Sequence, residues 1–162
     1  MPPAPEDVVP APFADRVPPA TAEEGPTTDD RFATLSLAEV EEASGELHRR
    51  IAVALRRIGE QGADQRGEHE TSPRQLVAAL AATVELAAAT LSAVAAGTPP
   101  ASGRSDHHPS SVAAVMYAAP TVSALLSRLE QDRRLLASLA RHLESRLDGE
   151  HATAWGETTL RT

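Results

Sequence analysis

SPRQLVAALAATVELAAATLSAVAAG, residues 72–97, is the stretch that decides the fold. It opens with a helix start signal, because Ser72 can cap the first turn, Pro73 suits the first helical position and Gln75 closes a capping box. It ends at Gly97, a residue type that commonly terminates helices in the left-handed conformation. The stretch therefore predicts a helix over residues 73–96.

Apolar side chains occupy almost every position of this predicted helix, and Glu85 is the only charged residue between Arg74 and Arg104. The length would also suffice for a membrane span. The helix is rich in alanine, however, has Glu85 near its middle and lacks an aromatic belt, all of which weigh against a span. We expect a central helix of a soluble bundle, and we keep peripheral membrane association through this helix as an alternative.

A second helix is predicted over residues 36–60. Ser36 and Glu39 form another capping box, and the helix is expected to end near Gly59 or Gly62. Glutamates precede arginines along it, an order that suits the helix dipole and pairing between residues four apart. Residues at alternating spacings of three and four form one stripe that is expected to face the core: Leu37, Val40, Ser44, Leu47, Ile51, Ala54 and Ile58.

The C-terminal part predicts a short helix over residues 111–119 and a long one over residues 121–148. Pro120 must either kink one continuous helix or start a new one. Asp132 and Arg133 interrupt the apolar stripe of the long helix, so that turn is expected at the bundle edge, although a buried Arg133 could pair with Glu85. The stripe itself consists of Val122, Leu125, Leu126, Leu129, Leu136, Leu139, Ala140, Leu143 and Leu147.

Together these elements predict an all-α protein, an antiparallel helical bundle of three long helices and one short helix over residues 35–148. An aromatic content of 2% with abundant alanine and leucine favours helices over strands. Residues 1–34 contain eight prolines and seven acidic residues, so they predict a disordered acidic arm. Residues 149–162 predict a flexible tail that contains Trp155.

Composition excludes several kinds of chemistry. The chain has no cysteine and no lysine, which removes disulfides, thiolate metal sites, cysteine nucleophiles and lysine Schiff bases. The formal net charge of -8 argues against a nucleic-acid partner, since neutralising phosphates needs a basic surface. The N-terminus has no positive region followed by an apolar run, so we expect a cytoplasmic protein.

The stretch SDHHPSS, residues 105–111, holds two adjacent histidines beside an aspartate. Without cysteines, a zinc site would need Asp106, His107 and His108 plus a distant ligand. The other histidines do not pair at helical spacing, and the chain lacks the Glu-x-x-His pairs of di-iron bundles. We therefore expect a polar loop that leads into a helix near Pro109, with no metal, no cofactor and no catalytic residue.

The motifs found are helix caps and apolar stripes, which specify a fold and not an activity. Our first expectation is a non-enzymatic protein with a regulatory, adaptor or structural role that binds a protein partner or itself as a homo-oligomer. The reason is that the other helices cannot easily cover every side of the helix over residues 73–96. Val8, Val9 and Phe13 of the arm and Trp155 of the tail are further candidate contacts.

The alternative is a small-molecule or metal-binding bundle, with or without enzymatic activity. The side chains available to it are Asp106, His107, His108, Tyr117 and Glu85.

Overall fold

The computed structural model describes residues 34–66, 70–99, 108–153 and 156–160. The expected arm over residues 1–34 lies outside these ranges except for Thr34. The described part confirms the all-helical bundle with three long helices and one short helix. The elements are α2 (Leu37–Asp64), α3 (Pro73–Ala96), α4 (Pro109–Ala118), α5 (Val122–His142), the 3-10 turn η1 (Glu144–Arg146), and the strands β1 (Glu150–Thr153) and β2 (Gly156–Thr159).

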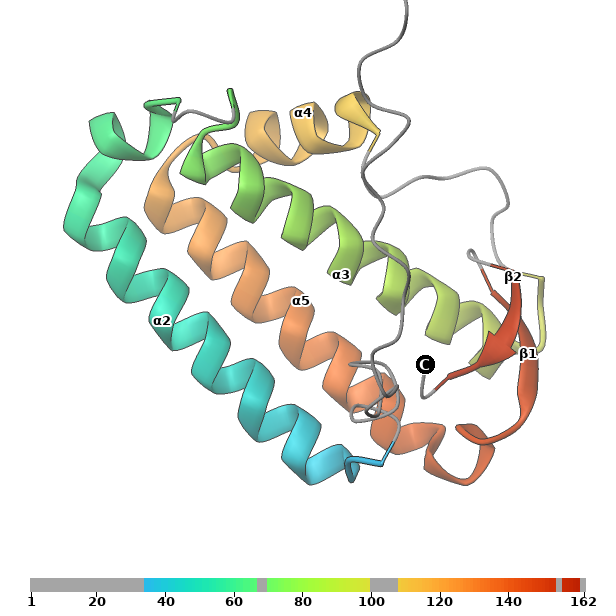
Figure 1. Cartoon of the computed structure of the whole chain (residues 1–162). Coiled ribbons are helices and arrows are strands. Elements are labelled where there is room, and N and C mark those ends of the chain that lie inside the picture. The colour runs from blue at the N-terminus through green and yellow to red at the C-terminus, as the bar shows by residue number, and fades with distance from the viewer. Residues whose placement is uncertain (1–33, 67–69, 100–107, 154–155, 161–162) are drawn as a thin grey trace, which may run out of the picture.

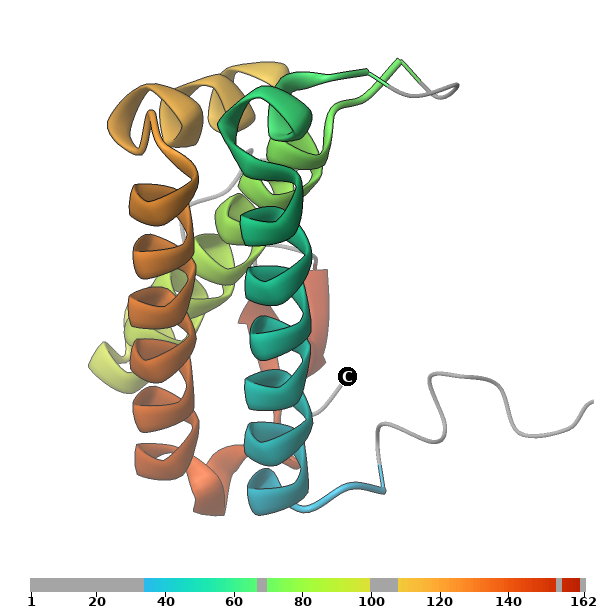
Figure 2. The same ribbon diagram turned by 90° about the vertical axis from the view of Figure 1, so that its left-hand side faces the viewer.

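The helices pack with α2 antiparallel to α3 and α5 (Figure 1). Figure 2 shows α2 and α5 side by side, with α3 crossing behind them and α4 lying across one end of the bundle. Within the expected C-terminal tail, β1 and β2 pair as an antiparallel hairpin. A lone two-stranded hairpin is marginally stable by itself, so it depends on contacts such as that of Leu160 with the apolar cluster near the end of α5.

Helix α3 is the central helix, as its sequence predicts. Both halves of the Ser72–Gln75 capping box are present, and Gly97 ends the helix in the left-handed conformation with φ of 67°. Most of its turns contribute to the core: Val77, Ala78, Ala81, Ala82, Leu86, Ala88, Leu91 and Val94 are buried. α3 is also long and apolar enough to cross a membrane, and half of its most apolar window is buried inside the fold.

Helix α2 is rotated relative to the sequence-based expectation. Val40, Leu47, Ala54 and Ile58 of the predicted inward stripe are exposed, and this part of the prediction is wrong. The buried side chains of the helix are Ala52, Leu55 and Ala63. A polar contact accompanies the rotation, because the half-buried His48 faces α5 and contacts Glu130. Ser44, which was expected to face inward, accepts from Arg133, and the more exposed Glu41 pairs with Arg141.

Gly59 interrupts α2 before its last turn. Its φ of 68° and ψ of -176° fall in a region that is essentially restricted to glycine. The helix was expected to end near this residue, and the regular helix does break here, but a further turn continues to Asp64. That turn carries Glu60 and Asp64, so the break sets the direction in which both carboxylates point.

Pro120 starts a new helix and does not kink a continuous one. α4 ends at Ala118, α5 begins at Val122, and the two helices meet at 111°. The long C-terminal helix ends at His142, earlier than expected, because the chain turns through η1 and thereby buries Leu143 and Leu147.

The turn with Asp132 and Arg133 was expected at the bundle edge, but both side chains are only 19% exposed. The alternative, a pair between Arg133 and Glu85, does not form either. Glu85 accepts from Nε of Arg128 at 2.6 Å, whereas Arg133 binds Glu130 on its own helix. Arg128 and Arg133 are five residues apart and therefore lie on different sides of α5. Arg128 is the one that faces α3, which places the ion pair on the α3 side of the helix.

Arg74 joins three parts of the chain at one end of the bundle. Its side chain is only 5% exposed, and it donates from Nε to Asp64 at 2.6 Å, from Nη2 to Glu60 at 2.5 Å and from Nη1 to the carbonyl of Pro120 at 2.8 Å. Glu60 in turn accepts from the backbone N–H of Val122 at 2.8 Å. One guanidinium thus fixes the end of α2, the start of α3 and the corner between α4 and α5.

We predict that Arg74→Ala lowers the free energy of unfolding by about 2–4 kcal/mol, because Glu60, Asp64 and the Pro120 carbonyl all lose their shared donor. The stability of Arg74→Lys should fall between that of wild type and that of Arg74→Ala, since an ammonium group cannot reproduce the planar set of N–H donors of a guanidinium. Arg141→Ala is the control: its exposed pair with Glu41, at 3.6 Å, should contribute under about 0.5 kcal/mol. Urea unfolding of the three variants measures this, and equal losses for Arg74 and Arg141 would contradict it.

We predict opposite effects of alanine at two glycines of α2. Gly59→Ala should destabilise the protein by about 1–3 kcal/mol through backbone strain alone, because a Cβ there meets nothing within 4 Å. Gly45→Ala should stabilise it by up to about 1 kcal/mol, because Gly45 is inside the helix and its nearest new neighbour is Nη1 of Arg133 at an ordinary 3.8 Å. Thermal unfolding measures both changes in stability. An unchanged stability of Gly59→Ala would contradict the predicted backbone strain.

Candidate functional site

A line of exposed apolar side chains runs along α2. We call it the α2 outer face, and it consists of Val40, Ala43, Leu47, Ala54 and Ile58. Its larger members are substantially exposed: Val40 by 44%, Leu47 by 52% and Ile58 by 44%. The spacings of three, four and seven residues place all five on one side of the helix. Scattered apolar residues are normal on surfaces, but an aligned row over most of a long helix is not.

The apolar surface continues onto α3 at one end. Leu76 is 60% exposed and, together with Ile58, lines an open hollow of about 650 Å³ between the end of α2 and the start of α3. Gly62 and Pro73 also line this hollow, together with four polar or charged residues: Gln61, Gln65, Arg66 and Thr71. The outer face therefore ends in a shallow depression with a mixed apolar and polar lining.

Charged side chains border the outer face along one flank. Glu39, Glu46, Arg50 and Arg57 follow one another at spacings of seven, four and seven, so they share a side of the helix. The Ser36 hydroxyl, as part of the cap, lowers the pKa of Glu39. Arg50, at 2.8 Å, lowers the pKa of Glu46, and Arg49 adds to this effect. The acidic members occupy the first half of the helix and the basic members the second half.

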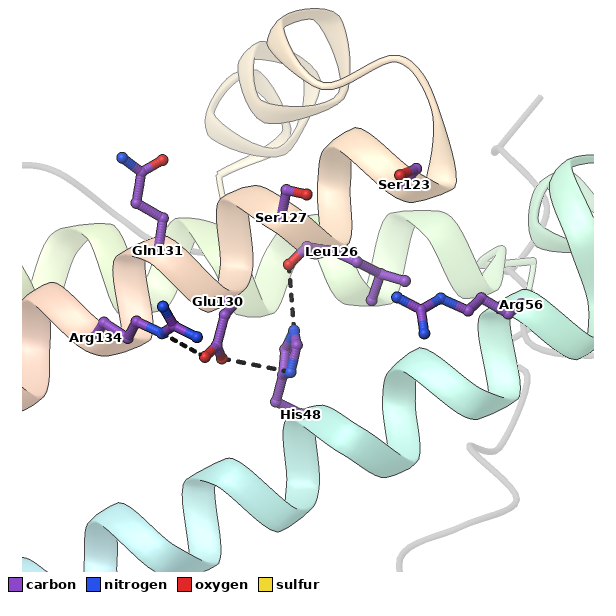
Figure 3. Close-up of a pocket in the computed structure, with 8 residues that line it drawn as sticks. All are labelled: His48, Arg56, Ser123, Leu126, Ser127, Glu130, Gln131 and Arg134. Atoms are coloured by element: carbon purple, nitrogen blue, oxygen red, sulfur yellow. Dashed lines mark hydrogen bonds and ion pairs between the residues drawn. The ribbon is translucent and has the colours of Figure 1, made fainter.

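A second hollow lies between α2 and α5 and measures about 360 Å³ (Figure 3). Its lining residues are His48, Arg56, Ser123, Leu126, Ser127, Glu130, Gln131 and Arg134. His48 points from α2 toward α5, with Nε2 at 3.2 Å from the carbonyl oxygen of Leu126 and Nδ1 at 3.4 Å from Glu130. Sequence reasoning did not identify this pair.

Glu130 is the electrostatic centre of this hollow. Hydrogen bonds from Arg133 are the main reason that its pKa falls from about 4.5 to about 2, and Arg134 and His48 contribute further. A carboxyl with so low a pKa holds no proton near neutral pH and is a poor general acid or base. Both ring nitrogens of His48 already face acceptors. The group therefore ties α2 to α5 and is not arranged for proton transfer to a ligand.

We predict that Glu130→Gln lowers stability at pH 7 by about 1–3 kcal/mol, because Arg133 and Arg134 lose their charge partner and His48 loses its contact with a carboxylate. The folded-state pKa of Glu130 lies below its ordinary value, so its stabilisation is complete above about pH 4.5 and disappears as the pH falls toward about 2. The gap between wild type and variant should therefore shrink over that range. Unfolding curves at pH 7, 4 and 2.5 measure it, and a constant gap would contradict the prediction.

The side chains considered for a metal or ligand site are not brought together. His108 caps α4 through its Nδ1, which accepts from the backbone N–H of Ser110, while Asp106 and His107 lie outside the described residues. Tyr117 is 89% exposed near the other end of α4, and Glu85 is paired with Arg128. Within the described ranges, no group of three possible ligands gathers around one point.

Asp132 is a partly buried carboxyl between α3 and α5 whose pKa lies above its ordinary value. Burial raises its pKa, and the neighbouring Glu85 raises it further. Nε of Arg128 lies 2.6 Å from a carboxylate oxygen of Glu85 and 3.9 Å from one of Asp132. Neither of the two hollows described above is lined by these acids, so a ligand in either hollow would not reach them.

The remaining candidate contacts, Val8, Val9, Phe13 and Trp155, lie outside the described residues. Comparisons of the chain with family models, curated proteins and solved structures found no match. The candidate site therefore rests on the geometry of this chain, and its strongest feature is the α2 outer face.

Proposed function

We propose that this protein is a non-enzymatic interaction module that binds a helix of a protein partner through the α2 outer face. The observation that carries the proposal is the rotation of α2. Polar contacts with α5 turn Val40, Leu47 and Ile58 away from the core and leave them aligned on the surface. Docking of an apolar helix would bury this row, which would otherwise stay in contact with water.

More of the exposed apolar surface lies on α2 than on α3, the helix that the sequence suggested. α3 was expected to need a partner, but half of its most apolar window is buried inside the fold, and Leu76 is its one large apolar side chain that is exposed. α2 buries far fewer of its side chains, because only Ala52, Leu55 and Ala63 are buried. A partner is therefore expected at α2, where the row from Val40 to Ile58 offers anchors at the helical spacings that groove-binding helices use.

The proposal predicts position-specific contact. A photo-cross-linking amino acid at position 47 of the full chain, expressed in its source cells, should form a covalent protein adduct. The same group at position 135 is a matched control, because Leu135 on α5 is 51% exposed and Leu47 is 52% exposed. A probe at position 54 should lose its adduct when Leu47→Asp is introduced, since a charge in the apolar row disfavours docking.

Equal adduct yields at positions 47 and 135, or no adduct at either, would refute the interaction through α2. The mass of the adduct reports what is bound, so the experiment does not assume an identity for the partner.

A further inference from the structure

Before Gly59, the charges of α2 divide near position 48. Glu39, Glu41, Glu42 and Glu46 precede this position, and Arg49, Arg50, Arg56 and Arg57 follow it, whereas Glu60 and Asp64 of the last turn bind Arg74. A helix with this division is complementary to a second copy of itself when the two run antiparallel, because each acidic half then meets a basic half. A parallel pair would place like charges opposite each other.

We propose, resting on the proposed function of the α2 outer face, that its occupant is a second copy of this chain, packed α2 against α2 in antiparallel orientation about a two-fold axis. Such an interface is self-complementary and closes at two subunits.

The flanking charges select one register. Position 48 is midway between Glu39 and Arg57, and it is also midway between Glu46 and Arg50. With the two-fold axis at position 48, Glu39 lies opposite Arg57 of the second copy, and Glu46 lies opposite its Arg50. Both pairs come from the single flank that borders the apolar row, so one rotation of the helix satisfies both.

The same register aligns the apolar row. Leu47 lies next to the axis and meets its counterpart, and Ile58 lies opposite position 38, two residues before Val40 of the second copy. Ala43 and Ala54 lie between the larger residues, and their small side chains let the two helices approach closely.

Within one chain, Glu46 already binds Arg49 at 2.6 Å and Arg50 at 2.8 Å, with all three side chains well exposed. Exposed pairs of this kind contribute little, so they do not compete strongly with pairing across the interface. Burial of the apolar row drives association, and the charges decide orientation and register.

The decisive experiment uses the full chain and two reciprocal substitutions. Wild type should be a dimer by light scattering behind size exclusion across a concentration series. Glu46→Arg or Arg50→Glu alone places like charges opposite each other twice, by symmetry, and should weaken dimerisation about tenfold. An equimolar mixture of the two variants should regain most of the wild-type affinity, because opposite charges then face each other again in the mixed dimer. The double variant E46R/R50E should dimerise by itself, since the exchange of the two charges restores both pairs.

Leu47→Asp should give a monomer, and Leu135→Asp is the matched control that should leave the dimer intact. Recovery of the dimer on mixing also shows that the weaker association of each single variant is not caused by misfolding, since two unfolded variants would not restore each other's association.

The outcomes separate the two proposals. If the wild type is a monomer and the position-47 adduct has the mass of a different protein, the proposed homodimer is refuted. The proposed interaction through the α2 outer face is then still supported. A dimer that survives Leu47→Asp, or a mixture without rescue, also overturns the antiparallel α2 pair. A monomer without any adduct overturns both.

Discussion

The arrangement of the helices depends on the buried guanidinium of Arg74. This side chain stands at the start of α3 and is only 5% exposed, so its charge must be compensated where it lies. Asp64 and Glu60 supply that compensation, and the last turn of α2 after Gly59 places them there. Its remaining bond goes to the carbonyl of Pro120. Pro120 marks the corner where α4 gives way to α5, so one side chain joins the α2–α3 connection to the α4–α5 corner.

A second layer of polar contacts fixes the rotation of α2. The core is built from small aliphatic side chains, with Leu125 its largest fully buried residue, and such a core can accept more than one rotation of a neighbouring helix. The contact of His48 with Glu130 and that of Ser44 with Arg133 remove this freedom. They also determine which residues remain outside, so the exposed apolar row follows from how α2 is held against α5.

The sequence predicts most of the helices and little of their orientation. The caps at Ser36 and Ser72 and the stop at Gly97 are local signals, and each lies at the start or end of the helix that it was expected to mark. The inward stripe of α2 was wrong at Val40, Leu47, Ala54 and Ile58, whereas Leu37 and Ile51 do pack against the core. The periodicity counted apolar residues, and a histidine such as His48, whose partner lies on a distant helix, carries no local sign of burial. The pairing of Glu85 with Arg128 was missed for the same reason.

The candidate site could be inferred only once the rotation of α2 was known. From sequence, Val40 and Ile58 belong to the core, and the separation of glutamates from arginines along α2 looks like pairing within one helix. Because the apolar row is exposed, the same charges flank a candidate protein interface, where they can pair with charges of another molecule. Pairing within the helix involves Glu46 and its nearest arginines, and the helix dipole favours acidic residues near the start of the helix. The proposed antiparallel pairing of two copies would add a second reason for the separation and would relate both flanking pairs to one axis.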